Sequence, residues 1–249
     1  MYPHMEGTSD VDIVLNLHVL SDDRVYKKLA RQLKDRGFKR YVDSDGKGHN
    51  WRWVRTISEY EHVMIEFLRD SAEELGGGTL AAVEGEGISA LAIDHLGIVQ
   101  DWYLEKEIHA DLLDGKGIAT ETVRFADLPA FIALKAFAFD DRAENKDAAD
   151  LVHVMRYAGP IEQVARQFID RYCEGKHLEV LDKAFDVLHR RFCDGTGIEG
   201  YLRDGPVACA LFMYDPNDQD VEEMRIREQR NVSAMVTQFL RMVRKGRAA

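Results

Sequence analysis

The sequence is poor in cysteine and has no long hydrophobic run. Its 249 residues include only three cysteines, Cys173, Cys193 and Cys209, which form no Cys-x-x-Cys pair and no Cys/His cluster. A set this sparse excludes a disulfide-dense scaffold and is typical of a chain that folds in a reducing compartment. No apolar run approaches about 18 residues and no signal peptide is recognisable, so the sequence predicts a cytoplasmic protein without a membrane partner.

Positive charge is also scarce. Lysine and arginine number 33 against 44 aspartates and glutamates, which gives a formal net charge of −11. This balance argues against indiscriminate binding to nucleic acids, which depends on clustered lysines and arginines, but it leaves room for a local basic groove. Apolar residues make up 45% of the chain. In a chain of this length, this share is enough to form a hydrophobic core without disulfide or metal cross-links. The length predicts one large or two small domains.

The hydrophobic pattern changes from a period of two to helical spacing along the chain. Alternation at 10–20 predicts a strand, and a helix is expected over 22–36 with Gly37 as its C-terminal glycine. Further strands are expected at 51–57, 61–68 and 122–128, with a turn at 43–48, while 80–120 is ambiguous and includes a candidate helix over 100–113. Helical patterns then cover 129–140, 144–157, 160–173, 176–193 and 218–246.

These patterns predict an α+β fold. We expect a mixed-sheet α/β domain over 1–126, followed by a helical C-terminal domain over 127–249.

Two aspartates lie on one face of the first predicted strand. Asp10 and Asp12 are two residues apart, so their side chains project from the same side, about 6–7 Å apart along the strand. Two carboxylates at this spacing repel each other unless they are exposed or a cation lies between them. Carboxylate oxygens are ligands of Mg²⁺, and a pair of such ions can hold the oxygens of a transferring phosphoryl group. The alternative is a polar face turned to solvent.

A third carboxylate stands in a predicted central strand. Glu66 alternates with the apolar residues Val63, Ile65 and Phe67 of the segment 61–68. A charged side chain inside such a strand is rarely buried without a partner. If this strand lies beside the first one, Glu66 joins Asp10 and Asp12. The alternative is an edge-strand glutamate.

Together with a downstream segment, these residues resemble the nucleotidyltransferase superfamily. The stretch Thr8-Ser9-Asp10-Val11-Asp12-Ile13-Val14 and the strand with Glu66 are followed by Asp127-Leu128-Pro129 and Lys135, then Arg142, then Lys146-Asp147-Ala148-Ala149-Asp150-Leu151. This order is similar to that of the abortive-infection (AbiEii/AbiGii) toxin nucleotidyltransferases, and the resemblance covers roughly residues 7–157.

The resemblance implies roles for nine residues. Asp10, Asp12 and Glu66 would be the catalytic, metal-binding carboxylates for Mg²⁺ or Mn²⁺. The nucleotide-binding residues would be Ser9, Lys135, Arg142, Lys146, Asp147 and Asp150. A nucleoside triphosphate would be the substrate, tRNA or a protein the acceptor, and a cognate antitoxin a partner. Metal ions with lysine and arginine suffice for such chemistry, because phosphoryl transfer depends mostly on positioning and charge neutralisation.

The residues of the downstream segment also have structural interpretations. Lys135 on an apolar helix can extend its charged end to solvent. Asp147 near the start of a helix complements the helix dipole. Asp147 and Asp150 are three residues apart and share a helical face, and Arg142 would lie near Lys146 if one helix covered both.

The sequence departs from the family pattern before Asp10. Members carry a Gly-Gly or Gly-Ser turn upstream, at a helix start where backbone N–H groups hold the triphosphate. Here Gly7 and Ser9 are too close to Asp10 to form that turn. Two alternatives therefore stand beside the toxin-like enzyme: a catalytically degenerate member that acts as a binding or regulatory protein, and a nucleotidyltransferase with a small-molecule acceptor.

Two further segments carry charge or aromatic rings. Trp51 and Trp53 share a face of a predicted strand and are expected in the core rather than on a stacking surface for nucleotides. The basic segment 241–247 is interpreted as a solvated helix end that complements the dipole, with contact to RNA as the alternative.

Overall fold

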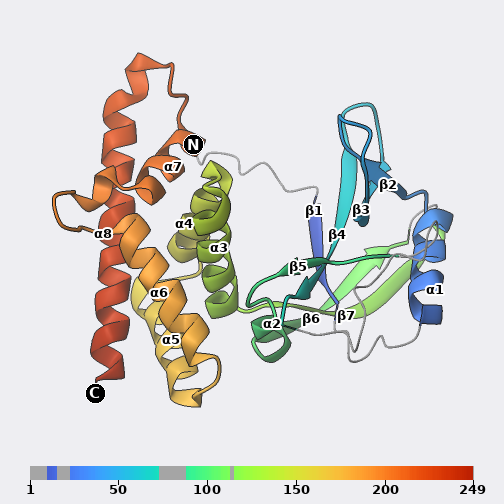
Figure 1. The fold of residues 1–249 in the computed structure, drawn as a ribbon, viewed down its shortest axis with the longest axis horizontal. Helices are drawn as coiled ribbons and strands as arrows, with labels where there is room; N and C mark the ends of the chain where they lie inside the picture. Colours follow the sequence, from blue (N-terminus) through green and yellow to red (C-terminus); the bar gives the residue numbers. More distant parts are fainter. Residues whose placement is uncertain (1–9, 16–22, 73–87, 113–114, 249) are drawn as a thin grey trace. The chain divides into compact units, whose positions relative to one another are not determined.

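The computed structural model describes residues 10–15, 23–72, 88–112 and 115–248 and confirms the α+β fold (Figure 1). A mixed-sheet region comes first and a mostly helical part, α3–α8, follows it. The described residues form two compact units. The first runs to Asp101 and includes Lys106–Val123, and the second consists of Trp102–Glu105 and the chain from Arg124 onward. Among the described residues, no helix is long and apolar enough to cross a membrane.

Five strands form the sheet of the first unit, in the order β1-β4-β3-β2 with β5 also paired to β4. β1 and β5 run parallel to β4, whereas β3 is antiparallel to both β4 and β2. Their bounds are Asp10–Val14 for β1, Lys39–Val42 for β2, Gly48–Thr56 for β3, His62–Asp70 for β4 and Leu91–Ile93 for β5. The strands expected at 51–57 and 61–68 are thus present as β3 and β4. The first expected strand ends at Val14, and 16–20 lies outside the described residues.

One face of this sheet builds the core of the first unit together with α1, Asp23–Asp35. Trp53 and Phe67 are almost fully buried there, against Leu33 of the helix. The helix ends as predicted, since Gly37 has a φ of +80° and the chain reverses there, with the Phe38 N–H donating to Leu33 O at 3.0 Å. This is the αL glycine that closes many helices.

The expected helix over 100–113 is wrong. A short helix, α2 (Ile98–Asp101), is followed by a two-stranded hairpin of β6 (Tyr103–Asp111) and β7 (Ile118–Ala126). Leu104 and Ile108 are four residues apart, a spacing that fits both one helical face and one strand face. Ion pairing across the hairpin, between Arg124 Nε and Glu105 Oε1 at 2.8 Å, lies on the opposite face. β7 also accounts for the strand expected at 122–128.

Six α-helices of the second unit are α3 (Leu128–Arg142), α4 (Asn145–Tyr157), α5 (Ile161–Glu174), α6 (Leu178–Phe192), α7 (Asp204–Met213) and α8 (Glu222–Arg247), with 3₁₀ turns at Gly200–Leu202 (η2) and Gln219–Val221 (η3). Five of them match the predicted helical segments to within a few residues, and α7 has no counterpart among those segments.

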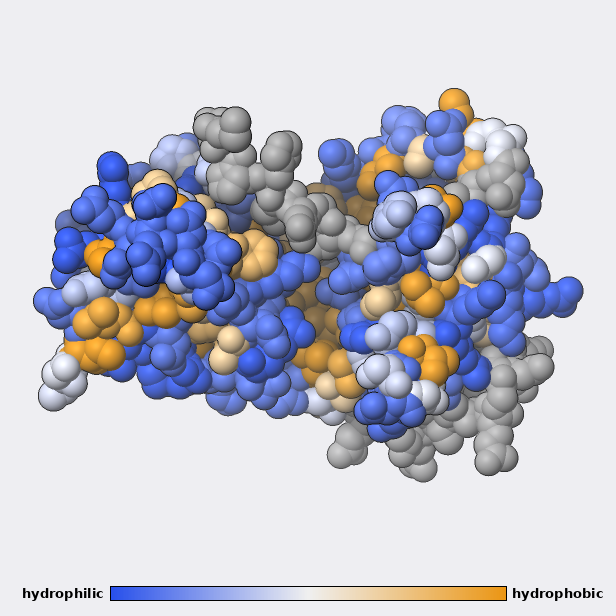
Figure 2. All heavy atoms as spheres, turned by 90° about the horizontal axis from the view of Figure 1, so that it is seen from above, coloured by the Kyte–Doolittle hydropathy of each residue, from blue (hydrophilic) through white to orange (hydrophobic). Residues whose placement is uncertain are grey.

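The second unit is organised around α8 and a cluster of aromatic rings. α8 packs along α5, α6 and α7. Phe168, Phe185 and Phe239 lie with ring centroids 5.0–5.6 Å apart, one ring from each of α5, α6 and α8. These three rings are buried, so the unit has its own hydrophobic core. On the face of this helical unit that Figure 2 shows, hydrophilic side chains dominate and hydrophobic ones form small patches.

Candidate functional site: three carboxylates on the sheet

The pairing of β1 with β4 gathers the three predicted carboxylates. In the parallel register, Asp12 lies opposite Glu66 and Asp10 lies opposite Met64. Paired residues of neighbouring strands point to the same side of a sheet, so Asp10, Asp12 and Glu66 share one face. Both aspartates are exposed, whereas the Glu66 side chain is only 18% exposed. The expectation that Glu66 joins Asp10 and Asp12 is therefore met in the strand register.

Burial and the charges of the two aspartates both affect the pKa of Glu66. Its pKa is raised above the ordinary 4.5, first by burial and then by the negative charges of Asp12 and Asp10. The guanidinium of Arg52 acts against this rise. Three carboxylates on one face bring negative charges close together, which is the physical condition under which carboxylates bind a cation.

Arg52 is a member of this site that the sequence did not reveal. It lies opposite Glu66 in the β3–β4 pair, and its Nε is 2.6 Å from Glu66 Oε1. Its guanidinium carbon lies 4.5 Å from the ring centroid of Trp51 and 5.1 Å from that of Tyr41. A usable signal existed: a hairpin that closes between Thr56 and His62 places Arg52 directly across from Glu66.

The donor set suits a hard divalent cation, but the arrangement is not a closed cage. Asp10, Asp12 and Glu66 offer only carboxylate oxygens, the ligands that Mg²⁺ and Mn²⁺ take. Within the described parts of the chain, however, no three His, Cys, Asp or Glu side chains are grouped closely enough to form a metal site. One Glu66 oxygen is held by Arg52 instead. The two exposed aspartates are thus the residues best placed to hold a cation here.

The predicted nucleotide-binding residues of the helical unit form a separate network between α3 and α4. Lys135 Nζ donates to Asp150 Oδ2 at 2.8 Å and to Asp147 Oδ1 at 3.2 Å. Arg142 donates two hydrogen bonds to the Asp147 carboxylate, of 2.6 Å and 2.8 Å. Asp147 and Asp150 are buried, at 1% and 8% exposure. The structure thus brings four of the predicted residues together.

The charges of this network stabilise one another. Burial alone would raise the pKa of Asp147, but the hydrogen bonds and charges of Arg142 and Lys135 outweigh it and hold that pKa below its ordinary value. For Lys135, burial acts to lower the pKa, and the bonds to Asp150 and Asp147 raise it overall. Both groups are therefore held in their charged forms.

Two predicted residues stand apart from this network. Lys146 is exposed in the first turn of α4. The idea that it neighbours Arg142 on one helix is wrong, because α3 ends at Arg142 and Ala143 takes a left-handed conformation with φ of +54°. Ser9 lies outside the described residues, as do Gly7 and the glycine tract at 76–78.

Asp127, which opens the downstream segment of the resemblance, has a structural role. Its Oδ1 accepts a hydrogen bond from the Ala130 N–H at 2.9 Å and so caps α3, while its Oδ2 pairs with Arg171 of α5. Such a cap stabilises a helix by about 1 kcal/mol. Asp127 therefore fixes the start of the helix that carries Lys135 and Arg142.

Comparison of the chain with protein-family models, with curated proteins and with solved structures finds no significant match.

Proposed function

We propose that this protein is a metal-dependent nucleotidyltransferase. The observation that carries the proposal is the parallel pairing of β1 with β4, which sets Asp12 opposite Glu66 with Asp10 on the same face. In such a transfer a hydroxyl oxygen of the acceptor bonds to the α-phosphorus of a nucleoside triphosphate, pyrophosphate leaves, and the hydroxyl proton passes to a base.

The residues of this face fit distinct parts of that chemistry. Asp10 and Asp12 would hold Mg²⁺ or Mn²⁺, which when bound neutralises phosphate charge. Glu66, whose pKa is raised first by burial, would accept the hydroxyl proton. Arg52 orients Glu66 through the pairing of their side chains at 2.6 Å. RNA such as tRNA or a protein as acceptor, and a cognate antitoxin as partner, enter the proposal from the resemblance alone.

Three observations favour a second candidate, a catalytically degenerate binding or regulatory protein. Arg52 already neutralises Glu66, the described residues contain no preformed three-ligand metal site, and Lys135 is held by two carboxylates. A protein that keeps the fold without turnover would show these features. This candidate predicts ligand binding that does not require a divalent cation.

Calorimetry with Mg²⁺ and non-hydrolysable NTP analogues distinguishes the candidates. We expect the full chain to bind an NTP analogue in the presence of Mg²⁺, and Asp12→Asn to weaken this binding about 10-fold or more, because a carboxylate ligand of the cation is removed. Asp45→Asn is the matched control, since Asp45 is exposed in the turn at 43–48 of the same unit.

Labelled NTPs then test transfer. Incubation with total tRNA, with protein and with small hydroxylated or amino acceptors shows where label accumulates, and label confined to small molecules would select the small-molecule alternative. Equal binding by the wild type, Asp12→Asn and Asp45→Asn, or binding without Mg²⁺, would reject the metal-dependent enzyme.

A further inference from the structure

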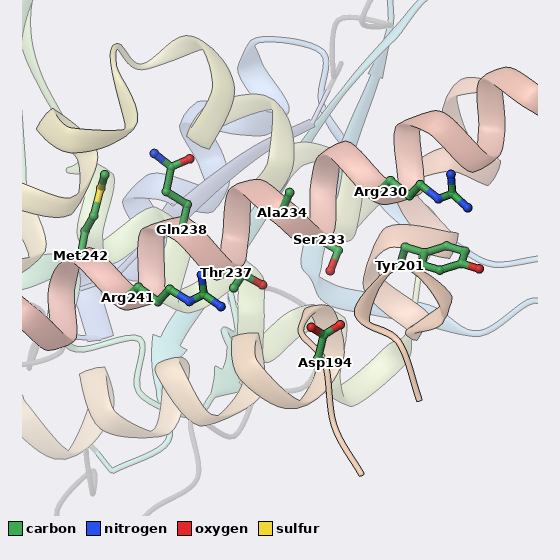
Figure 3. A pocket seen from close by; sticks show the side chains of 9 residues that line it. All are labelled: Asp194, Tyr201, Arg230, Ser233, Ala234, Thr237, Gln238, Arg241 and Met242. Carbon is green, nitrogen blue, oxygen red and sulfur yellow. The ribbon is translucent and has the colours of Figure 1, made fainter. Parts of the chain in front are cut away.

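A groove on the helical unit lies along α8, beside the turn η2. It encloses about 590 Å³, and its lining includes Tyr201, Arg230, Ser233, Arg241 and Asp194 (Figure 3). A second cavity of about 250 Å³ shares Asp194, Thr237 and Arg241 with it and adds Arg244. The two cavities therefore adjoin along α8, and guanidinium groups line both; together they are called the groove here.

The spacing of these residues along α8 places cations at both ends of the groove. Arg230 and Arg241 are 11 residues apart, close to three helical turns, so they lie on one face about 16 Å apart along the axis. Ser233 and Thr237 fall between them on the same face. In Figure 3 the Ser233, Thr237 and Arg241 side chains extend from α8 to the side on which Asp194 lies, with Arg230 beside the Tyr201 ring.

The turn η2 packs closely against α8 beside the groove. A Cβ on Gly200 would lie 2.3 Å from Ser233 Oγ, so only glycine lets η2 approach α8 this closely. The Gly200 N–H donates to Asp194 Oδ1 at 2.6 Å, which fixes the carboxylate. Arg230 is stacked on Tyr201, with its guanidinium carbon 5.0 Å from the ring centroid. These interactions position the polar groups before any ligand arrives.

The groove carries an excess of positive charge. Within the described part of the chain, none of Arg230, Arg241 and Arg244 forms an ion pair with a carboxylate, whereas many other arginines do. Three guanidinium groups against the single carboxylate of Asp194 leave a local surplus of positive charge in a chain whose net charge is −11. This surplus of positive charge favours the binding of an anionic ligand.

We propose that this groove binds a ligand with more than one phosphate group. The planar guanidinium group of arginine can donate two parallel hydrogen bonds to phosphate oxygens, and Ser233 and Thr237 line the wall between Arg230 and Arg241. Cations at both ends fit an elongated ligand better than a single small anion. The phosphates can belong to a small bisphosphate or to a nucleic-acid strand. This proposal does not rest on nucleotidyl transfer.

Two probes of the full chain test the proposal: adenosine 3′,5′-bisphosphate by calorimetry, and a labelled uridine tetranucleotide by fluorescence anisotropy, with adenosine as the uncharged control. We expect at least one phosphorylated probe to bind saturably and adenosine not to bind. The double variant Arg230→Gln/Arg241→Gln should weaken binding about 10-fold or more. It should also lower the salt dependence, by about one unit in the log–log slope for each phosphate that an arginine no longer neutralises.

Arg227→Gln is the matched control, because Arg227 is an exposed arginine of the same helix that does not line the groove. It should change affinity less than about twofold, since surface charge pairs contribute little. Binding of only the bisphosphate identifies a small molecule as the phosphate source, and binding of the tetranucleotide identifies a strand. No binding of either probe at about 1 mM, or an equally weakened affinity in Arg227→Gln, overturns the proposal.

Discussion

Replacing Asp147 with asparagine should destabilise the helical unit strongly. Asp147 is 1% exposed and accepts two hydrogen bonds from Arg142 and one from Lys135. A hydrogen bond to a charged group contributes about 1.5–3 kcal/mol. The Arg142 side chain is 59% exposed, so solvent screening reduces its share to about 1 kcal/mol or less. Lys135 keeps Asp150 at 2.8 Å and is not left unpaired. The free energy of unfolding should therefore fall by about 2–3 kcal/mol.

The measurement is urea denaturation of Asp147→Asn beside Asp170→Asn. Asp170 pairs with Arg166 at 3.3 Å, and both side chains are more than half exposed, so the same chemical change should cost less than about 0.5 kcal/mol there. Because the pKa of folded Asp147 lies below 3.8, its contribution to stability is present above pH 3.8 and is lost as the pH falls through the folded pKa. The wild type should thus lose more stability on acidification than Asp147→Asn. Equal destabilisation by the two substitutions would refute the assignment.

Two further changes test packing and the sheet site. Gly205→Ala should lower the free energy of unfolding by about 1–3 kcal/mol in urea denaturation, because its Cβ would meet the buried Phe192 ring at 2.4 Å; an unchanged midpoint would contradict the tight fit. Arg52→Gln should raise the pKa of Glu66 further, seen in a carboxyl-carbon NMR titration, since Arg52 lowers that pKa. A raised folded pKa means that stability falls as the pH rises above 4.5, so this fall should be larger in Arg52→Gln, and an unmoved Glu66 titration would dismiss Arg52 as its partner.

The helices could be predicted from the sequence because they rest on local spacing. The segments expected at 129–140 and 144–157 correspond to α3 and α4 within one or two residues. The helix α7 is hidden in the sequence, because Gly205 and Pro206 resemble the residues of a loop. Both lie in its first turn, where proline loses no helical hydrogen bond and glycine admits the Phe192 ring. That ring comes from another helix, so local spacing holds no trace of it.

At the sheet site, the three carboxylates could be predicted from the pattern of single strands, whereas their neighbour Arg52 on β3 could not. Alternation alone places Asp10 and Asp12 on one face, and a carboxylate inside an apolar strand marks Glu66. Alternation also predicts an apolar face with Val11 and Ile13, yet they are 50% and 36% exposed. Among the described strands, β1 lies at the end of the order β1-β4-β3-β2, so its apolar side chains have a neighbouring described strand on one side only. The position of β1 in the sheet follows from strand order, and the partner Arg52 follows from the register of the β3–β4 hairpin; alternation within one strand gives neither.

The direction of the pKa shifts separates the two charged clusters chemically. In the helical unit the pKa of Asp147 is lowered and that of Lys135 is raised, so each charge is already balanced, as in a network that joins two helices. On the sheet the pKa of Glu66 is raised, because burial, together with the negative charges of Asp12 and Asp10, outweighs the opposing effect of Arg52. A cluster in which acids and bases pair gains little from a bound ion, whereas carboxylates gathered on one face repel one another, and a cation reduces that repulsion. The sheet face is therefore where a cation-dependent activity should be sought, and the balanced network is where removal of a charge should appear first as reduced stability.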